Sequence, residues 1–264
     1  MNHLLIIDPQ NDFCDIPGAT LPVAGANDDM LRLAAFIREH GAELDNITVT
    51  LDSHSPVHIA HPAWWQDAKG TSPPPFTAVS AADVQSGKWL TRDPRRQASS
   101  LTYVRELERG GKYVLVIWPE HCLIGSWGHN IHAAVKTELD AWARRELKPV
   151  EVVIKGMNPG TEHYSAVRAE VPDASDPDTQ VNTKLVRSIA AADRVIVAGE
   201  ALSHCVAATV RDLERLTPGG VARKLTLLAD ASSPVGGFEA LGSAFVSELT
   251  AKGMTTSKTG KVAP

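Results

Sequence analysis

Three side chains of complementary chemistry stand at the ends of short apolar runs that lie far apart in the sequence. They are Asp8, Lys155 and Cys205, in the segments HLLIID (3–8), VVIK (152–155) and RVIVAGEALSHC (194–205). A thiol that attacks an amide carbonyl must be ionised, needs a base to take its proton, and needs a cation to stabilise negative charge. These three residue types therefore form a candidate catalytic set for covalent chemistry at a carbonyl group.

The residues around Cys205 predict that it lies in the first turn of a helix. The apolar positions after it recur at helical spacing, and Ser203 is of a type that caps helix N-termini. Unpaired N–H groups and the positive end of the helix dipole favour a thiolate at such a position. Taken alone, the pattern leaves two other interpretations open: Cys205 as a small buried hydrophobic residue, and Asp8 with Lys155 as a structural ion pair.

The order of the elements predicts how these side chains come together. Apolar runs alternate with amphipathic segments, which indicates a three-layer α/β/α fold around a mostly parallel central sheet of about six strands. We expect strands over 3–8, 46–51, 113–117, 152–155, 195–198 and 224–229, a short one at 254–257, and helices over 28–39, 99–108, 130–147, 182–192 and 237–251. In a doubly wound parallel sheet, ligands bind at the edge formed by the carboxyl ends of the strands. We expect Asp8, Lys155 and Cys205 to meet at that edge.

Five motifs, read in order, resemble those of one enzyme family. They are LLIIDPQNDF (4–13), LDSH (51–54), WPEHCLIGSWG (118–128), VIKGMNPGTEHYSAV (153–167) and VAGEALSHCV (197–206). With them the chain resembles the cysteine hydrolase family that contains nicotinamidases and isochorismatase-like proteins, and above all its nicotinamidase branch. The resemblance implies the isochorismatase-like hydrolase fold and an amidohydrolase activity.

The resemblance also implies a role for each residue of the catalytic set. Asp8 would accept the proton of the Cys205 thiol and later return it to departing ammonia, while Lys155 holds the pair in place. The N–H groups of Ala201 and Cys205 would form the oxyanion hole, which stabilises the negative oxygen of the tetrahedral intermediate. In this family the peptide bond before the first of these donors is cis, which corresponds here to Glu200-Ala201.

A metal site is a further implication. Asp52, His54 and His121 match the family's metal ligands, and His58 matches a position that ligates metal in some relatives, whereas His61 matches none. One carboxylate and two imidazoles suit zinc, iron or manganese and leave positions open for water and substrate. We expect one divalent ion, with zinc as the first choice. The isochorismatase branch lacks this ligand triad, which favours an amidase.

The expected reaction is the hydrolysis of nicotinamide to nicotinate and ammonia through a thioester on Cys205. Phe13, Trp118 and Tyr164 match positions that line the substrate pocket, where aromatic rings can stack on a pyridine; core packing is the alternative interpretation of each. Two other functions stay open: an amidase for another small amide or N-carbamoyl compound, and a non-catalytic family member that binds a metal or ligand.

Length and composition fit one large domain over 1–264. The chain has 264 residues, 43% of them hydrophobic and 22% charged, and a domain of this size buries roughly three quarters of its unfolded surface. Two segments, at about 62–112 and 130–147, are longer than in the usual nicotinamidase core and are interpreted as insertions. The first is rich in proline and contains Trp64, Trp65 and Trp89. We expect it to act as a lid that changes which amide enters.

Charge and cysteine content limit the partners. A net charge of -5 gives no basic surface for nucleic acid, and no apolar run approaches the ~20 residues of a membrane span. The N-terminus passes directly into a strand without the features of a signal peptide, so we expect a cytoplasmic location. Three cysteines without CxxC spacing argue against a disulfide scaffold or a redox switch. We expect a small-molecule amide substrate, no nucleic acid or membrane partner and, from the family resemblance, a homo-oligomer.

Overall fold

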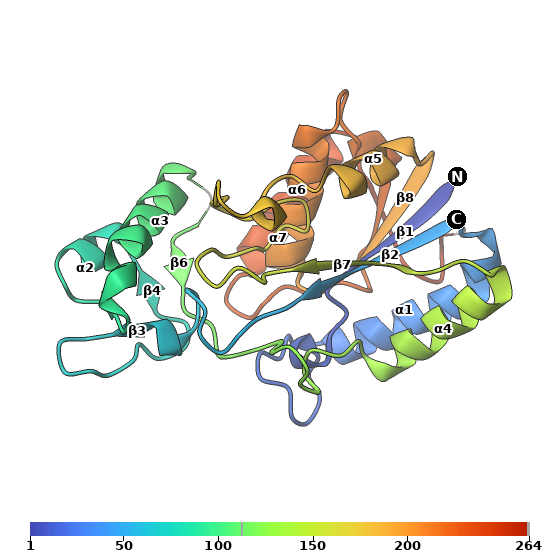
Figure 1. The fold of residues 1–264 in the computed structure, drawn as a ribbon. Coiled ribbons are helices and arrows are strands. Elements are labelled where there is room, and N and C mark those ends of the chain that lie inside the picture. Colours follow the sequence, from blue (N-terminus) through green and yellow to red (C-terminus); the bar gives the residue numbers. More distant parts are fainter. Residues whose placement is uncertain (112, 263–264) are drawn as a thin grey trace.

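A computed structural model describes residues 1–111 and 113–262 and contains one central sheet in which all neighbouring strands are parallel (Figure 1). The strand order is β10-β9-β8-β1-β2-β7. The bounds are β1 Asn2–Ile7, β2 Asn46–Asp52, β7 Glu151–Lys155, β8 Arg194–Gly199, β9 Leu225–Leu228 and β10 Thr255–Ser257. The expected three-layer α/β fold with about six strands is confirmed.

Alternating side chains of the strands supply two apolar cores, one on each face of the sheet. In β1, Leu4 and Ile6 belong to one core, and Leu5 and Ile7 belong to the other. This alternation follows from the two-residue period of a strand, and burial on both faces explains why β1 is apolar from Leu4 to Ile7.

Helices cover both faces of the sheet (Figure 1). One face carries α1 (Ala26–His40) and α4 (Ala133–Glu146), which pack against each other; the other carries α5 (Thr183–Ala191), α6 (Ala207–Leu216) and α7 (Glu239–Ala251). Most of the segment at 130–147 thus forms the covering helix α4, and Trp142 of this helix lies in the same core as Leu4. No helix in the described part of the chain is long and apolar enough to cross a membrane.

The strand expected at 113–117 lies outside the central sheet, and this prediction is corrected. Leu115–Val116 (β6) pairs antiparallel with Ala78–Val79 (β4). The backbone N–H groups that follow are taken up by the same region, since Ile117 donates to Thr77 O and Trp118 donates to Ala60 O. The expected strand at 254–257 is present as β10, parallel to β9.

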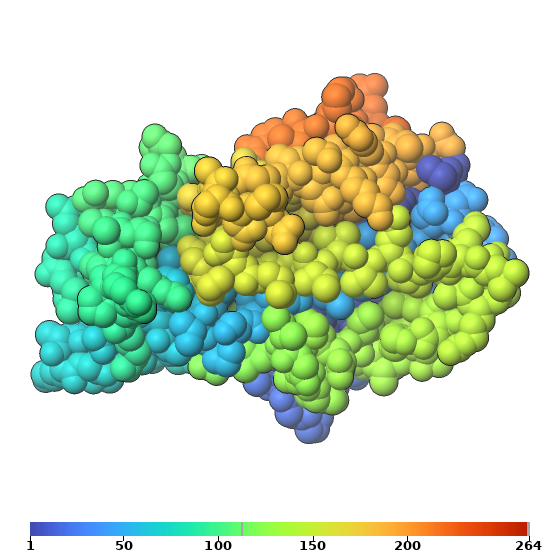
Figure 2. Space-filling view, viewed as in Figure 1, coloured from blue at the N-terminus to red at the C-terminus, as the bar shows by residue number. Residues whose placement is uncertain are grey.

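The segment at 62–112 forms a lobe at one end of the molecule, drawn in blue-green to green in Figure 2; residue 112 lies outside the described residues. The lobe contains a two-stranded sheet of β3 (Trp65–Gln66) and β5 (Leu90–Thr91), together with α2 (Ala81–Gln85) and α3 (Gln97–Arg109). Trp64 and Trp65 are buried in its core, and Trp89 packs against that core. These rings therefore take part in core packing, and the expected role of the segment as a lid stays a prediction.

Candidate active site

Three strand ends bring one ammonium group against two carboxylates and a thiol. Lys155 Nζ, at the end of β7, lies 2.8 Å from Asp8 Oδ2 and 3.0 Å from Asp52 Oδ1, and donates to Cys205 Sγ at 3.6 Å. Atoms of Asp8, Asp52 and Cys205 lie within 4.8 Å of one another. All four side chains are buried. The predicted meeting of Asp8, Lys155 and Cys205 is therefore present in the structure.

Asp8 is held by its neighbour in β2. Its backbone N–H donates to Thr50 Oγ1 at 3.0 Å, and the same hydroxyl donates to Asp8 Oδ1. Burial raises the pKa of the Asp8 carboxyl above its ordinary value, and the Lys155 ammonium opposes that rise. A carboxylate with an increased affinity for protons, fixed next to a thiol, is suited to accept and return a proton.

Cys205 lies in a π-helical turn, Leu202–Val206, between β8 and α6. The turn follows a cis peptide bond at Glu200-Ala201, as expected. The predicted cap by Ser203 is not made: its hydroxyl contacts His204 Nδ1 and accepts from Val235 N–H. Burial raises the pKa of the Cys205 thiol well above its ordinary value, against the effect of Lys155. Burial thus favours the protonated thiol, and a neighbouring base such as Asp8 is suited to take up its proton.

The expected metal ligands lie beside this set. Asp52 Oδ2 is 3.0 Å from His54 Nε2 and 3.5 Å from His121 Nε2. Burial opposes ionisation of Asp52, but His54 and Lys155 outweigh it, and the pKa of this carboxyl lies well below its ordinary value. His54 Nδ1 is buried with no hydrogen-bond partner among the described residues. A carboxylate oxygen with two imidazole nitrogens turned toward it fits a divalent cation.

Gly156 makes room for this arrangement immediately after β7. Its φ is +84°, and a Cβ there would lie 2.8 Å from Cε1 of His54 and 2.9 Å from Oδ1 of Asp52. Only glycine tolerates both the dihedral angle and the close approach. The sequence KG at 155–156 therefore joins the candidate catalytic lysine to the wall of the candidate metal site.

The two remaining histidines of the segment after β2 have different surroundings. His58 Nδ1 accepts from Ala60 N–H and its Nε2 lies 3.2 Å from Thr161 O, so both ring nitrogens are occupied. His61 is also buried, but its Nε2 has no hydrogen-bond partner in the described chain. Ligand nitrogens of His54, His61 and His121 lie within 4.8 Å of one another. The structure thus brings His61, and not only His58, next to the expected metal ligands.

A small cavity of about 30 Å³ opens onto the thiol. Phe13, Trp118 and Tyr164, the three aromatic residues expected there, all line it, as do Ala201 and Cys205; the remaining wall consists of Leu21, Asp52, His121, Glu162, His204 and Val235. Trp118 Nε1 donates to the Tyr164 hydroxyl at 2.9 Å, which fixes the two rings relative to each other. Ligand pockets usually measure about 300–1,000 Å³. A ring-sized substrate therefore enters only when wall side chains move.

Three residues near the thiol were not predicted. Glu162 and His204 line the cavity, and Thr50 holds Asp8. Glu162 is 3% exposed, and its Oε2 has no hydrogen-bond partner among the described residues. The sequence signal that could have identified Glu162 is its position two residues before Tyr164, a residue already expected to line the pocket. Thr50 offers no comparable signal, because threonine is common in strands.

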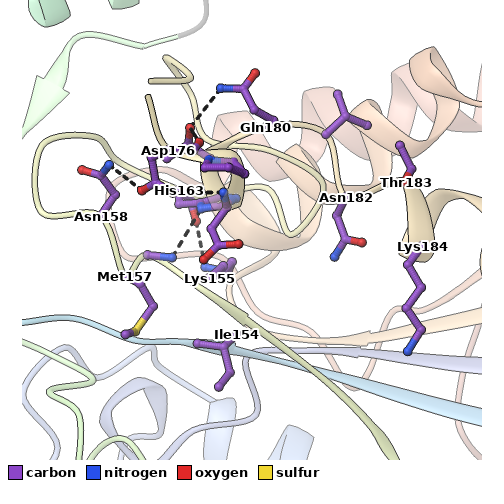
Figure 3. Close-up of a pocket in the computed structure, with 15 residues that line it drawn as sticks. Ile154, Lys155, Met157, Asn158, His163, Asp176, Gln180, Asn182, Thr183 and Lys184 are labelled. Carbon is purple, nitrogen blue, oxygen red and sulfur yellow. Dashed lines mark hydrogen bonds between the residues drawn. The ribbon is translucent and has the colours of Figure 1, made fainter. Parts of the chain in front are cut away.

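A larger pocket of about 540 Å³ lies beside the cavity, on the outer side of β7 (Figure 3). Lys155 and His163 are among its lining residues, and Lys155 Nζ donates to His163 O at 3.0 Å. Across the same pocket, Asn158 Nδ2 donates to Asp176 Oδ2 at 2.8 Å. Neither Cys205 nor Asp8 lines this pocket. Of the two, only the smaller cavity is lined by Cys205.

Comparison with solved structures assigns the fold class. No protein-family model and no curated protein sequence matches this chain. Solved structures of nicotinamidases, pyrazinamidases and isochorismatase-family proteins do match it along nearly its whole length. The chain has the isochorismatase-like hydrolase fold.

Three of these structures illustrate the likeness. The yeast nicotinamidase Pnc1p is 21% identical, with 97% of this chain and 99% of that chain covered and a TM-score of 0.66. PnC1 from L. infantum, solved with nicotinate, is 23% identical, with coverages of 100% and 96% and a TM-score of 0.63. The pyrazinamidase of Pyrococcus horikoshii, solved with zinc, is 18% identical, with coverages of 97% and 98% and a TM-score of 0.58.

Proposed function

We propose that this chain is a metal-dependent cysteine amidohydrolase that converts nicotinamide to nicotinate and ammonia. The observation that carries the proposal is the buried contact of Lys155 with Asp8 and Cys205, where Cys205 also lines a cavity with aromatic walls. A base, a nucleophile and a cation within reach of one another are what amide hydrolysis through a covalent intermediate requires. The similarity to nicotinamidases that have been solved with a nicotinate or an inhibitor supports this substrate.

The first half of the reaction forms a thioester. The thiol proton of Cys205 passes to Asp8 while Sγ bonds to the amide carbon, and the carbonyl oxygen gains the negative charge. The N–H groups of Ala201 and Cys205 receive that oxygen. When the carbonyl re-forms, the C–N bond breaks and Asp8 gives its proton to the departing nitrogen, so that ammonia leaves. Lys155 keeps Asp8 and Cys205 aligned throughout.

The second half regenerates the thiol. A water molecule adds to the thioester carbon and gives a proton to Asp8, and the same N–H groups stabilise the second tetrahedral intermediate. The C–S bond then breaks, the acid product leaves, and the proton returns to Cys205. Asp8 thus acts as base and acid in turn. This role suits a carboxyl whose pKa is raised by burial, while Lys155 limits that rise.

Asp52, His54 and His121 would hold a divalent metal ion, and such an ion would supply a Lewis-acid contact for the pyridine nitrogen that orients the carboxamide toward Cys205. The zinc reported for the P. horikoshii pyrazinamidase supports zinc as the ion. Phe13, Trp118 and Tyr164 would enclose the ring on its apolar faces.

A second candidate function has a specific observation in its favour. Glu162 and His204 place two hydrogen-bonding side chains in the cavity wall, and nicotinamide offers no second polar substituent for them beyond its ring nitrogen and carboxamide. An amidase for a more polar small amide or an N-carbamoyl compound would use such groups. The two functions share the reaction of Cys205 and differ only in the substrate.

The test is ammonia release from nicotinamide, measured beside a panel of other small amides and carbamoyl compounds. Cys205→Ala must abolish release, and Cys14→Ala is the matched control because Cys14 is equally buried but lies outside the cavity. Treatment with a chelator should remove activity, and added zinc, iron or manganese should restore it. No ammonia from nicotinamide, but release from another amide by the same thiol, would establish the second candidate instead.

A further inference from the structure

We infer that His61 is a fourth protein ligand of the metal ion, so that three imidazoles and one carboxylate hold it. The inference rests on the metal site of the proposed function and extends it to a residue that the motif comparison excluded. His61 lies in the segment between β2 and the lobe, three residues after His58. Its ring packs against two expected ligands, with ring centroids 5.3 Å from His54 and 5.4 Å from His121.

The hydrogen bonds of His61 leave one nitrogen ready for a metal. Nδ1 lies 3.3 Å from Pro56 O, and because a carbonyl only accepts, Nδ1 carries the proton. Nε2 is then left with its lone pair, buried and without a hydrogen-bond partner among the described residues. His121 has the same contact at Nδ1, 2.8 Å from Pro119 O, while its Nε2 lies 3.5 Å from Asp52 Oδ2. A backbone carbonyl that fixes the tautomer of a ligating histidine is a common feature of metal sites.

The backbone of His61 is also fixed. Its N–H donates to His58 O at 2.9 Å, and its carbonyl accepts from Trp64 N–H at 3.2 Å. These two hydrogen bonds hold the backbone of His61 in a turn at the start of the lobe, so the position of the ring is already set. By contrast, His58 has both nitrogens satisfied within the protein, so that a metal bond would cost it a hydrogen bond to Ala60 or Thr161.

This assignment gives the lobe a chemical role. The segment at 62–112 begins directly after His61, and Trp65 Nε1 donates to Ile59 O at 2.7 Å, on the same turn. Packing of the lobe thereby positions a ligand of the ion. A set of three imidazoles and one carboxylate suits zinc, iron, manganese or cobalt and leaves an open position in five-coordinate or six-coordinate geometry.

The experiment measures zinc affinity by competition with a chromophoric chelator, together with the visible absorption spectrum of the cobalt-substituted protein. His61→Ala and His61→Gln should each weaken zinc binding by at least about tenfold and change the cobalt bands, since loss of even an indirect contact at a metal site costs about 10–100-fold. The matched control is His132→Ala, since His132 is a buried histidine outside this cluster; this variant should keep both the affinity and the spectrum. Thermal unfolding of the metal-free forms identifies variants that fail to fold, and His61→Gln retains a polar side chain for that reason.

Wild-type affinity and an unchanged cobalt spectrum in folded His61 variants would overturn the inference, as would a loss in His132→Ala as large as that in His61→Ala. Asp52→Ala and His121→Ala separate this result from failure of the proposed function. If they lose zinc while His61 variants retain it, only the fourth ligand is refuted. If none of these variants weakens zinc binding, the metal site itself is refuted, and this inference with it.

Discussion

Lys155 determines the electrostatics of the site because its ammonium group is buried between Asp8 and Asp52. An uncompensated buried charge is costly, and removing one partner of such a cluster typically destabilises a protein by about 3–5 kcal/mol. In variants of Lys155, a loss of activity therefore cannot be separated from a loss of folding stability. Substitution of Asp8 separates the two effects, because Lys155 keeps Asp52 as an ion-pair partner when residue 8 is neutral.

Asp8→Asn is expected to slow ammonia release by about 10²–10⁴-fold while the protein stays folded, because the amide cannot accept the thiol proton but can still bond Thr50. Steady-state rates and thermal unfolding check this together. Asp28→Asn, an exposed position on α1, is the control and should change neither quantity. Wild-type rates in Asp8→Asn would exclude Asp8 as the base.

His204 gives a prediction for the pH dependence of stability. Burial lowers the pKa of His204 from its ordinary value of 6.5 to about 4. Between these values the unfolded chain binds a proton that the folded chain does not, so this group makes the protein less stable as the pH falls from about 6.5 toward 4. His204→Asn should reduce the slope of unfolding free energy against pH by up to about 1.4 kcal/mol per pH unit. Equal slopes in urea titrations of both proteins would contradict the assignment.

At the scale of single residues, the sequence supplied the types and order of the catalytic set but not all of its contacts. Asp8, Lys155 and Cys205 end or follow apolar strands, so topology alone predicts that they meet. The choice between His58 and His61 depends on which ring nitrogens are already bonded, and spacing carries no information about that. Glu162, His204 and Thr50 became visible only as neighbours in space.

At the scale of elements, the contact of β1 with β8 aligns the strand ends that carry Asp8 and the turn before Cys205. Ile7 pairs with Gly199, whose φ is +113°. A Cβ on Gly199 would lie 1.9 Å from Ile7 O, which no side-chain movement can relieve. The glycine is therefore required by both the dihedral angle and the approach of the neighbouring backbone.

Gly199→Ala is expected to destabilise the protein by more than about 3 kcal/mol, because backbone strain adds to displacement of β1. Gly236→Ala is the matched control: its Cβ would meet nothing within 4 Å, and the change should stay within about 0.5 kcal/mol. Urea unfolding followed by circular dichroism measures both. Comparable stability of the two variants would contradict this prediction, because it would mean that β1 and β8 can move apart at Gly199 without cost.

The elements of the central sheet were predictable because runs such as those of β1 and β8 are apolar on both faces. The prediction failed for 113–117 because a short apolar run does not indicate its partner strand. Residues 115–116 pair with the lobe, and the partner strand β4 is itself only two residues long. The prediction of a Ser203 cap failed because the turn after the cis peptide is π-helical. In this turn the Ser203 hydroxyl contacts His204 and Val235.

At the scale of the whole molecule, the lobe and the sheet share one core. Trp65 and Val79 of the lobe belong to the same apolar cluster as Leu5 of β1 and Val210 of α6. A continuous core predicts that the lobe and the sheet unfold together. Self-association stays a prediction, and sedimentation of the purified protein would test it.

Trp65→Ala is expected to lower the unfolding free energy by about 3–5 kcal/mol, the usual cost of deleting a buried tryptophan. Calorimetry should show a single transition at a lower midpoint, with calorimetric and van't Hoff enthalpies equal as in the wild type. A separate early transition for the lobe would contradict the shared core.

The central claim is that Cys205 forms a covalent acyl intermediate with the amide substrate. The most direct measurement mixes the protein with nicotinamide, stops the reaction with acid within its first turnovers, and determines the mass of the peptide that contains Cys205. A nicotinoyl group on that peptide in the wild type, and its absence in Cys205→Ala, is the predicted result. Steady ammonia release with no acyl group on Cys205, or with release preserved in Cys205→Ala, would contradict the account.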